Sequence, residues 1–146
     1  SAVSVAMWKK YFTNTGFAFN RKEKKEHGEG GIIIGFPLLG KNVCIVDDVI
    51  TTGTSSKEAV KIIRENGGNP TMCVIAFDRQ ERGTDGNRSA VQEFERNYKI
   101  PVYSAANLEN LILVLTEDVK FKSCVVPNCE KSLEKILLYR DKYGVK

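Results

Sequence analysis

Residues 43–56 read VCIVDDVITTGTSS, and this stretch decides the fold. Residues 42–47 form a continuous apolar run, which is typical of a strand in a parallel sheet that is buried on both faces. A short loop rich in Thr, Ser and Gly follows and leads into an amphipathic helix at 55–66, which the glycine pair at 67–68 ends. The stretch therefore predicts a strand, a short loop and a helix in succession, the basic unit of a parallel sheet.

The same alternation continues on both sides of this stretch. Upstream, the pattern predicts a helix at 2–12 and strands at 16–20 and 31–36. Downstream, it predicts strands at 71–77 and 100–104 and helices at 88–98, 107–115 and 129–142. Regular alternation of strands and helices favours an α/β fold with a mainly parallel sheet flanked by helices.

The length and composition indicate one globular domain over residues 1–146. Apolar residues make up 42% of the chain and charged residues 27%, as in ordinary globular proteins. No apolar run approaches the roughly 20 residues of a membrane span. The net charge of +4 is concentrated in residues 1–27, which fits a small polyanion such as a phosphate compound better than nucleic acid. We expect neither a membrane nor a nucleic acid as partner.

The four cysteines indicate a reducing, cytoplasmic protein. Cys44 and Cys73 lie within apolar runs and are expected to be small buried hydrophobes. Cys124 and Cys129 have no histidine near them, because the only histidine is His27. A zinc site and structural disulfides are the less favoured alternatives.

The loop between the strand at 42–47 and the helix at 55–66 predicts an anion site. Gly53 lets a ligand approach the backbone, and the helix start supplies unpaired N–H groups and a positive dipole end. Hydroxyl donors come from Thr51, Thr52, Thr54 and Ser55. Asp47 and Asp48 would repel a phosphate but would hold hydroxyl groups or a cation. A ribose 5-phosphate, with its phosphate and its diol, satisfies both halves of the loop.

Other readings of this loop remain open. An aspartate at a strand end, followed by a hydroxyl residue at a helix start, is also ordinary capping chemistry. Acidic pairs beside a strand also occur in phospho-acceptor receiver domains. A Walker phosphate loop is excluded, because the sequence contains no GxxxxGK[ST] motif.

Three segments together resemble one enzyme family. The stretch 43–56 resembles the phosphoribosyl pyrophosphate (PRPP) signature of type I phosphoribosyltransferases. Residues 19–31, FNRKEKKEHGEGG, are similar to the flexible catalytic loop of orotate phosphoribosyltransferases, and residues 77–83, FDRQERG, resemble the base-site segment of that family. The order and spacing of the three segments match, over about residues 1–115. The chain resembles the C-terminal two-thirds of such an enzyme, so we expect it to be N-terminally incomplete.

The resemblance implies a function. Enzymes of this family transfer ribose 5-phosphate from PRPP to orotate with Mg²⁺ as cofactor, giving orotidine 5′-monophosphate and pyrophosphate in de novo pyrimidine (UMP) biosynthesis. It also implies a homodimer in which the 21–31 loop is shared between subunits. The alternative is a non-catalytic PRPP-binding regulatory module. The cationic loop disfavours that alternative, because a sensor needs no cations at a leaving group.

The resemblance also assigns roles to individual residues. The implied catalytic residues are Arg21, Lys22, Lys25, His27 and Asp48. The implied PRPP-binding residues are Asp47, Asp48, Val49, Ile50, Thr51, Thr52, Gly53, Thr54 and Ser55. Orotate would be bound by Thr51 and Arg79, and Mg²⁺ would be held indirectly, with PRPP, by Asp47 and Asp48. For Arg79, an ion pair with Asp78 or Glu81 is the competing interpretation.

Overall fold

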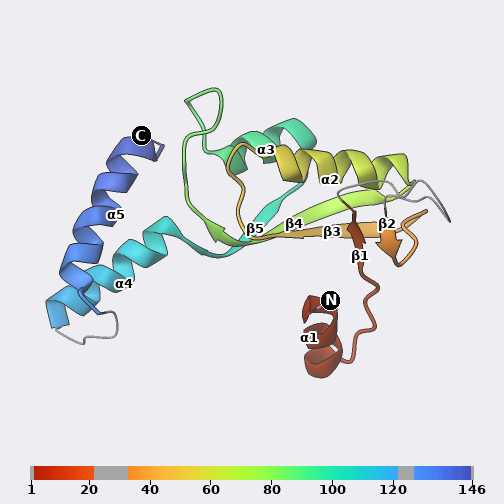
Figure 1. Ribbon diagram of the computed structural model, residues 1–146, viewed down its shortest axis with the longest axis horizontal. Coiled ribbons are helices and arrows are strands. Elements are labelled where there is room, and N and C mark those ends of the chain that lie inside the picture. The colour runs from red at the N-terminus through yellow and green to blue at the C-terminus, as the bar shows by residue number, and fades with distance from the viewer. Residues whose placement is uncertain (1, 22–32, 122–126, 146) are drawn as a thin grey trace. The chain divides into compact units, whose positions relative to one another are not determined.

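The computed structural model describes residues 2–21, 33–121 and 127–145 of the chain (Figure 1). Contacts between Cα atoms divide it into two units, Ser1–Leu39 and Gly40–Lys146. The larger unit contains the stretch that decides the fold.

The smaller unit contains the N-terminal helix and a two-stranded ribbon. Helix α1 (Ala2–Tyr11) has no buried residue. Strands β1 (Ala18–Asn20) and β2 (Ile33–Gly35) pair antiparallel, with Phe19 opposite Ile34. The predicted helix and the two predicted strands are confirmed with shorter bounds. Most of the predicted catalytic loop lies outside the described residues.

The larger unit is built on a three-stranded parallel sheet. Strands β3 (Asn42–Asp47), β4 (Asn69–Asp78) and β5 (Val102–Asn107) lie in the order β3-β4-β5. Both strand pairs are parallel. Helix α2 (Thr54–Glu65) connects the first two strands, and helix α3 (Ala90–Tyr98) connects the second and third. The predicted α/β fold with a mainly parallel sheet is therefore confirmed.

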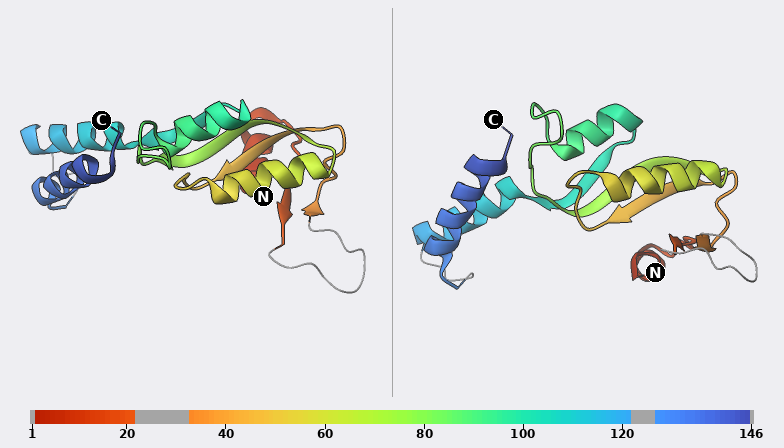
Figure 2. Two further views of the ribbon diagram at one scale, coloured as in Figure 1. Left: turned by 90° about the horizontal axis from the view of Figure 1, so that it is seen from above. Right: turned by 45° about the horizontal axis from the view of Figure 1, so that its top comes forward.

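Helices α2 and α3 lie on the same face of this sheet (Figures 1 and 2). Val60 and Ile63 are buried on α2, and Phe94 is buried on α3 at 1% exposure. Ile45 and Ile75 are buried beneath them. Strand residues point alternately to opposite faces, so the buried set belongs to the face that carries the helices.

The other face of the sheet is exposed in the described structure. Val46 is 56% exposed, Met72 38% and Tyr103 59%. Cys44 is also exposed, whereas Cys73 is fully buried. The prediction that both cysteines are buried is therefore wrong for Cys44. Cys44 and Ile45 are consecutive in β3, so their side chains point to opposite faces of the sheet, and that of Cys44 points away from α2 and α3.

Two further helices complete the larger unit. Helix α4 (Leu108–Phe121) follows β5 directly, and α5 (Cys129–Tyr143) packs against it. Leu108 and Leu115 are buried apolar residues of α4. Helix α4 extends six residues beyond the predicted end at 115. The prediction ended the helix where the apolar run stops, but the polar residues 116–118 are helical too. Among the described helices, none is long and apolar enough to cross a membrane.

Candidate functional site

The acidic pair lies at the carboxyl end of β3. The backbone N–H of Asp48 donates to Asp47 Oδ1 at 3.0 Å, and the N–H of Val49 donates to Asp48 Oδ1 at 2.8 Å. Asp47 is half-buried and Asp48 is exposed. Each of these contacts uses only one carboxylate oxygen, so Oδ2 of each residue remains able to accept a hydrogen bond from a ligand.

The loop after the acidic pair is anchored by the buried residues Ile50, Gly53 and Ser56, with exposed residues between them. Ile50 is 4% exposed and Ser56 is 1% exposed. The hydroxyl-bearing residues Thr51, Thr52 and Ser55 are exposed between or beside these anchors. The hydroxyl groups of Thr52 and Thr54 lie 2.9 Å apart. The loop therefore offers several hydroxyl groups to solvent on a fixed backbone.

Helix α2 begins without a side-chain cap. Its N-cap residue is Gly53, with φ of 72° and ψ of 9°, and no side-chain hydrogen bond caps this helix. The Gly53 carbonyl accepts from the Lys57 N–H at 2.8 Å, so the helical hydrogen bonds begin there. The N–H groups of the first turn are the donors that a helix leaves unpaired. They and the dipole of a 12-residue helix form a surface suited to an anion.

Hydrogen bonds join the ends of β3 and β4. The Asp48 carbonyl accepts from the N–H groups of Ala76 and Phe77, both at 3.0 Å. The segment after β4 therefore begins beside the acidic pair, as expected for parallel strands that end at one edge of a sheet. Arg79 is the first residue after β4.

Arg79 pairs with Glu81. Its Nη2 lies 2.8 Å from Glu81 Oε1 and 3.0 Å from Oε2. An ion pair with Asp78 or Glu81 is the competing interpretation of Arg79 from the sequence, and the pair with Glu81 is present. The Arg79 Nε is buried and has no hydrogen-bond partner among the described residues. A buried donor without a partner costs free energy, so the arginine keeps a binding capacity that the described residues do not use.

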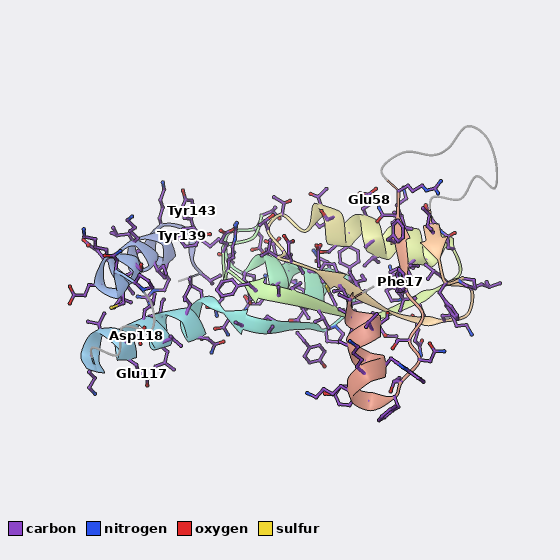
Figure 3. All side chains as sticks on the ribbon, turned by 60° about the horizontal axis from the view of Figure 1, so that its bottom comes forward. Phe17, Glu58, Glu117, Asp118, Tyr139 and Tyr143 are labelled. Atoms are coloured by element: carbon purple, nitrogen blue, oxygen red, sulfur yellow. The ribbon has the colours of Figure 1, made fainter. Side chains whose placement is uncertain are left out.

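A cavity of about 450 Å³ adjoins Arg79. It is lined by Arg79, Glu81, Arg82, Tyr139 and Tyr143. The two tyrosines lie side by side on α5, with ring centroids 5.0 Å apart (Figure 3). The sequence interpretation did not include them. The only signal was an aromatic pair four residues apart near the end of the chain, which predicts contact along a helix but not contact with a distant loop.

The Cys73 thiol is protonated at neutral pH. Burial, with a smaller contribution from the negative charge of Asp47, raises the pKa of Cys73 to about 11. The thiolate form, which is the nucleophile and metal ligand, is therefore scarce below that pH.

The structure brings together part of the predicted site. The predicted PRPP-binding residues 47–55 form one continuous segment of the larger unit, from the last residue of β3 to the first turn of α2, and Arg79 follows the neighbouring strand. Arg21 lies in the smaller unit. Lys22, Lys25 and His27 lie outside the described residues. No group of three or more His, Cys, Asp or Glu residues that could hold a metal occurs within 2–21, 33–121 and 127–145.

Comparisons with known proteins point to one family by similarity. No family model matches the chain. Orotate phosphoribosyltransferase of Nitrosococcus oceani is 46% identical over 145 residues, which are 99% of this chain and 62% of that protein. The same enzyme of Marinobacter nauticus is 50% identical over 129 residues, 88% of this chain and 56% of that protein. The chain resembles orotate phosphoribosyltransferases along nearly its whole length.

A solved structure agrees with this similarity. The crystal structure of orotate phosphoribosyltransferase from Francisella tularensis superposes with a TM-score of 0.75 at 28% identity, over 98% of this chain and 63% of that one. The resemblance stated from the three sequence segments is confirmed. The chain spans about three-fifths of the length of these relatives.

Proposed function

We propose that the protein containing this chain is an orotate phosphoribosyltransferase, which transfers ribose 5-phosphate from PRPP to orotate and releases pyrophosphate. The observation that carries the proposal is the uncapped start of α2, which a short loop joins to the Asp47–Asp48 pair at the end of β3. Similarity to curated relatives of this name over up to 99% of the chain supports the same conclusion.

The 47–55 loop suits a ribose 5-phosphate. The α2 start and the exposed hydroxyl groups suit the phosphate. The free carboxylate oxygens of Asp47 and Asp48 suit the two ribose hydroxyls, because a carboxylate accepts hydrogen bonds from vicinal hydroxyls without a change of protonation.

The donor set fits Mg²⁺ only together with the substrate. Mg²⁺ prefers oxygen ligands and keeps several waters, so one or two carboxylates and substrate phosphates usually hold it. Asp47 and Asp48 provide two such carboxylates at an exposed loop. When bound, Mg²⁺ would neutralise charge on the pyrophosphate. We therefore propose an ion shared between PRPP and this pair.

Arg79 is the residue that we propose for the orotate carboxylate. A guanidinium presents a planar set of donors that matches a carboxylate, and the buried Nε of Arg79 lacks a partner among the described residues. Thr51, on the neighbouring loop, would add a hydroxyl contact to the base.

The remaining roles rest on the sequence. Arg21, Lys22, Lys25 and His27 would bind the pyrophosphate as negative charge develops on it in the transition state. A homodimer that shares the 21–31 loop and a cytoplasmic location are part of the same proposal. The alternative function is a PRPP-binding regulatory module, which would bind PRPP without consuming it.

The experiment compares three ligands by isothermal titration calorimetry. They are ribose 5-phosphate, uridine 5′-monophosphate and orotidine 5′-monophosphate, and the last two differ only in the base carboxylate. We expect orotidine 5′-monophosphate to bind roughly 10- to 100-fold more tightly than uridine 5′-monophosphate, because an Arg–carboxylate contact contributes about 1.5–3 kcal/mol. Arg79→Ala should remove this preference and leave ribose 5-phosphate binding unchanged.

Turnover separates the enzyme from the regulatory module. The loss of orotate absorbance is followed with PRPP and Mg²⁺ in the protein that contains this chain. Consumption of orotate in step with pyrophosphate release supports the enzyme. Binding of PRPP without consumption would favour the regulatory module, and equal binding of the two nucleotides would contradict the role of Arg79.

A further inference from the structure

The segment that carries Arg79 is tied to the end of the chain. The Arg82 N–H donates to the Tyr143 carbonyl at 2.8 Å, and the Val145 N–H donates to the Gln80 carbonyl at 3.3 Å. Glu81 and Gly144 form an antiparallel bridge between these bonds. We call residues 143–145 the C-terminal strap. The strap adds a short strand-like pairing to residues 80–82.

The backbone on the other side of this segment is also fixed. The Glu81 carbonyl accepts from the Ala90 N–H at 3.1 Å, where α3 begins. Gln80 has a positive φ of 52°, which a residue other than glycine keeps only where its surroundings hold it. The Gln80 side chain holds this conformation, because its Oε1 accepts from the Glu109 N–H at the start of α4 at 3.0 Å.

These contacts fix the backbone of Glu81, and Glu81 in turn holds the guanidinium of Arg79. Both Glu81 oxygens contact the same nitrogen, Nη2. The Glu81 side chain is only 18% exposed and that of Arg79 is 40% exposed. A half-buried pair with a fixed carboxylate restrains the long arginine side chain, which otherwise loses rotamer freedom when it binds a ligand.

We propose that Glu81 is a positioning residue for Arg79, and that the C-terminal strap supports it. In this arrangement Glu81 engages Nη2 and leaves Nε for a substrate carboxylate. The inference rests on the proposed function, because it assumes that Arg79 binds that carboxylate. On this proposal, residues 143–145 influence the affinity for the base without contacting the ligand.

A purely structural role for Glu81 predicts a different result. In that case its loss lowers stability and weakens all ligands alike. If Glu81 instead competes with the ligand for Arg79, its loss strengthens the binding of the carboxylate. Only a positioning role selectively lowers the preference for orotidine 5′-monophosphate over uridine 5′-monophosphate.

The test measures that preference by calorimetry in the wild-type chain and in Glu81→Ala, Glu81→Gln and Gly144→Ala. Glutamine keeps an acceptor oxygen for Arg79 without the charge. A Cβ at Gly144 would lie 2.6 Å from the Arg140 carbonyl oxygen, so alanine must displace the strap. Val145→Ala is the matched control, because it keeps the backbone N–H that bonds to Gln80. Ribose 5-phosphate reports on the 47–55 loop in every variant.

We expect Glu81→Ala to lower the preference at least fivefold, Gly144→Ala to lower it less, and Glu81→Gln to lie between Glu81→Ala and wild type. Ribose 5-phosphate affinity should stay within twofold throughout, and Val145→Ala should match wild type. If Glu81→Ala does not fold, the same preference is compared between wild type, Glu81→Gln and Gly144→Ala. An unchanged or increased preference in the Glu81 variants, while Arg79→Ala abolishes it, would overturn this inference alone. No preference in the wild type would overturn the proposed role of Arg79 as well.

Discussion

Replacing Gly53 with alanine tests the anion site at the start of α2. Gly53 has a φ of 72°, and an alanine Cβ there would lie 3.4 Å from Lys57 Cε and 3.9 Å from Ile50 Cγ2. These are ordinary contacts, so the cost is in the backbone rather than in crowding. A left-handed conformation costs an L-residue about 1–2 kcal/mol. Alanine recovers about 0.4–1 kcal/mol by restricting the unfolded chain.

The net loss of stability should therefore be on the order of 1 kcal/mol, which lowers the Tm of a domain of this size by roughly 2–5 °C. Gly86 provides the matched control. Its φ is 74° and a Cβ there would have no atom within 4 Å, but it lies in the loop before α3. Gly86→Ala should lose about the same stability, since the backbone cost is the same.

The two variants should differ in ligand binding. At Gly53 the strained backbone and the added methyl group adjoin the uncapped first turn of α2, so we expect ribose 5-phosphate to bind at least about tenfold more weakly, or about 1.4 kcal/mol. Gly86→Ala should bind as wild type does. Thermal unfolding and calorimetry on the three proteins make the comparison. Wild-type affinity in Gly53→Ala, or equal weakening in Gly86→Ala, would refute the assignment of the anion site.

Three further measurements follow from the same structure. Asp47→Asn and Asp48→Asn should each weaken ribose 5-phosphate binding about tenfold in calorimetry, while thermal unfolding changes little because asparagine keeps an acceptor for the backbone N–H. Ser89→Ala should lower the free energy of unfolding in urea by about 1 kcal/mol, because Ser89 Oγ accepts from the Gln92 N–H and closes a capping box at α3; an unchanged urea midpoint would contradict this. The free energy of unfolding should fall from about pH 9 to pH 11 relative to Cys73→Ala, because the unfolded thiol ionises near its ordinary pKa of 9.0 and the folded one only near about 11. Parallel stability curves for the two proteins across that range would refute the last expectation.

Local sequence pattern was sufficient for the strand, loop and helix around the acidic pair. An apolar run, a hydroxyl-rich loop and an amphipathic helix each have a local physical cause, so 43–56 folds as predicted. The exposure of Cys44 could not be predicted in this way. An apolar strand shows that its side chains tolerate burial, but the coverage of each face depends on helices elsewhere in the chain.

The partner of Arg79 also depends on contacts beyond the local pattern. Asp78 and Glu81 are both close in sequence, and the sequence left both open. In the structure, Asp78 Oδ1 accepts from the Gln80 N–H at 2.9 Å, and the strap sets the position of Glu81. The contact with α5 joins residues about 60 positions apart, and no short-range pattern predicts such a pairing.

The simple strand order of the larger unit has a consequence for how the protein is made. Because β3, β4 and β5 are neighbours in the order of the sequence, β4 leaves the ribosome when β3 has already emerged, and β5 when β4 has. Asn42 and Asn69, whose side chains meet at the start of β3 and β4, are separated by 27 residues. The parallel sheet can therefore grow one βα unit at a time during synthesis, with modest loop-closure cost at each step. The strap is synthesised after α5, so the segment that carries Arg79 reaches its final geometry only once residues 143–145 have emerged.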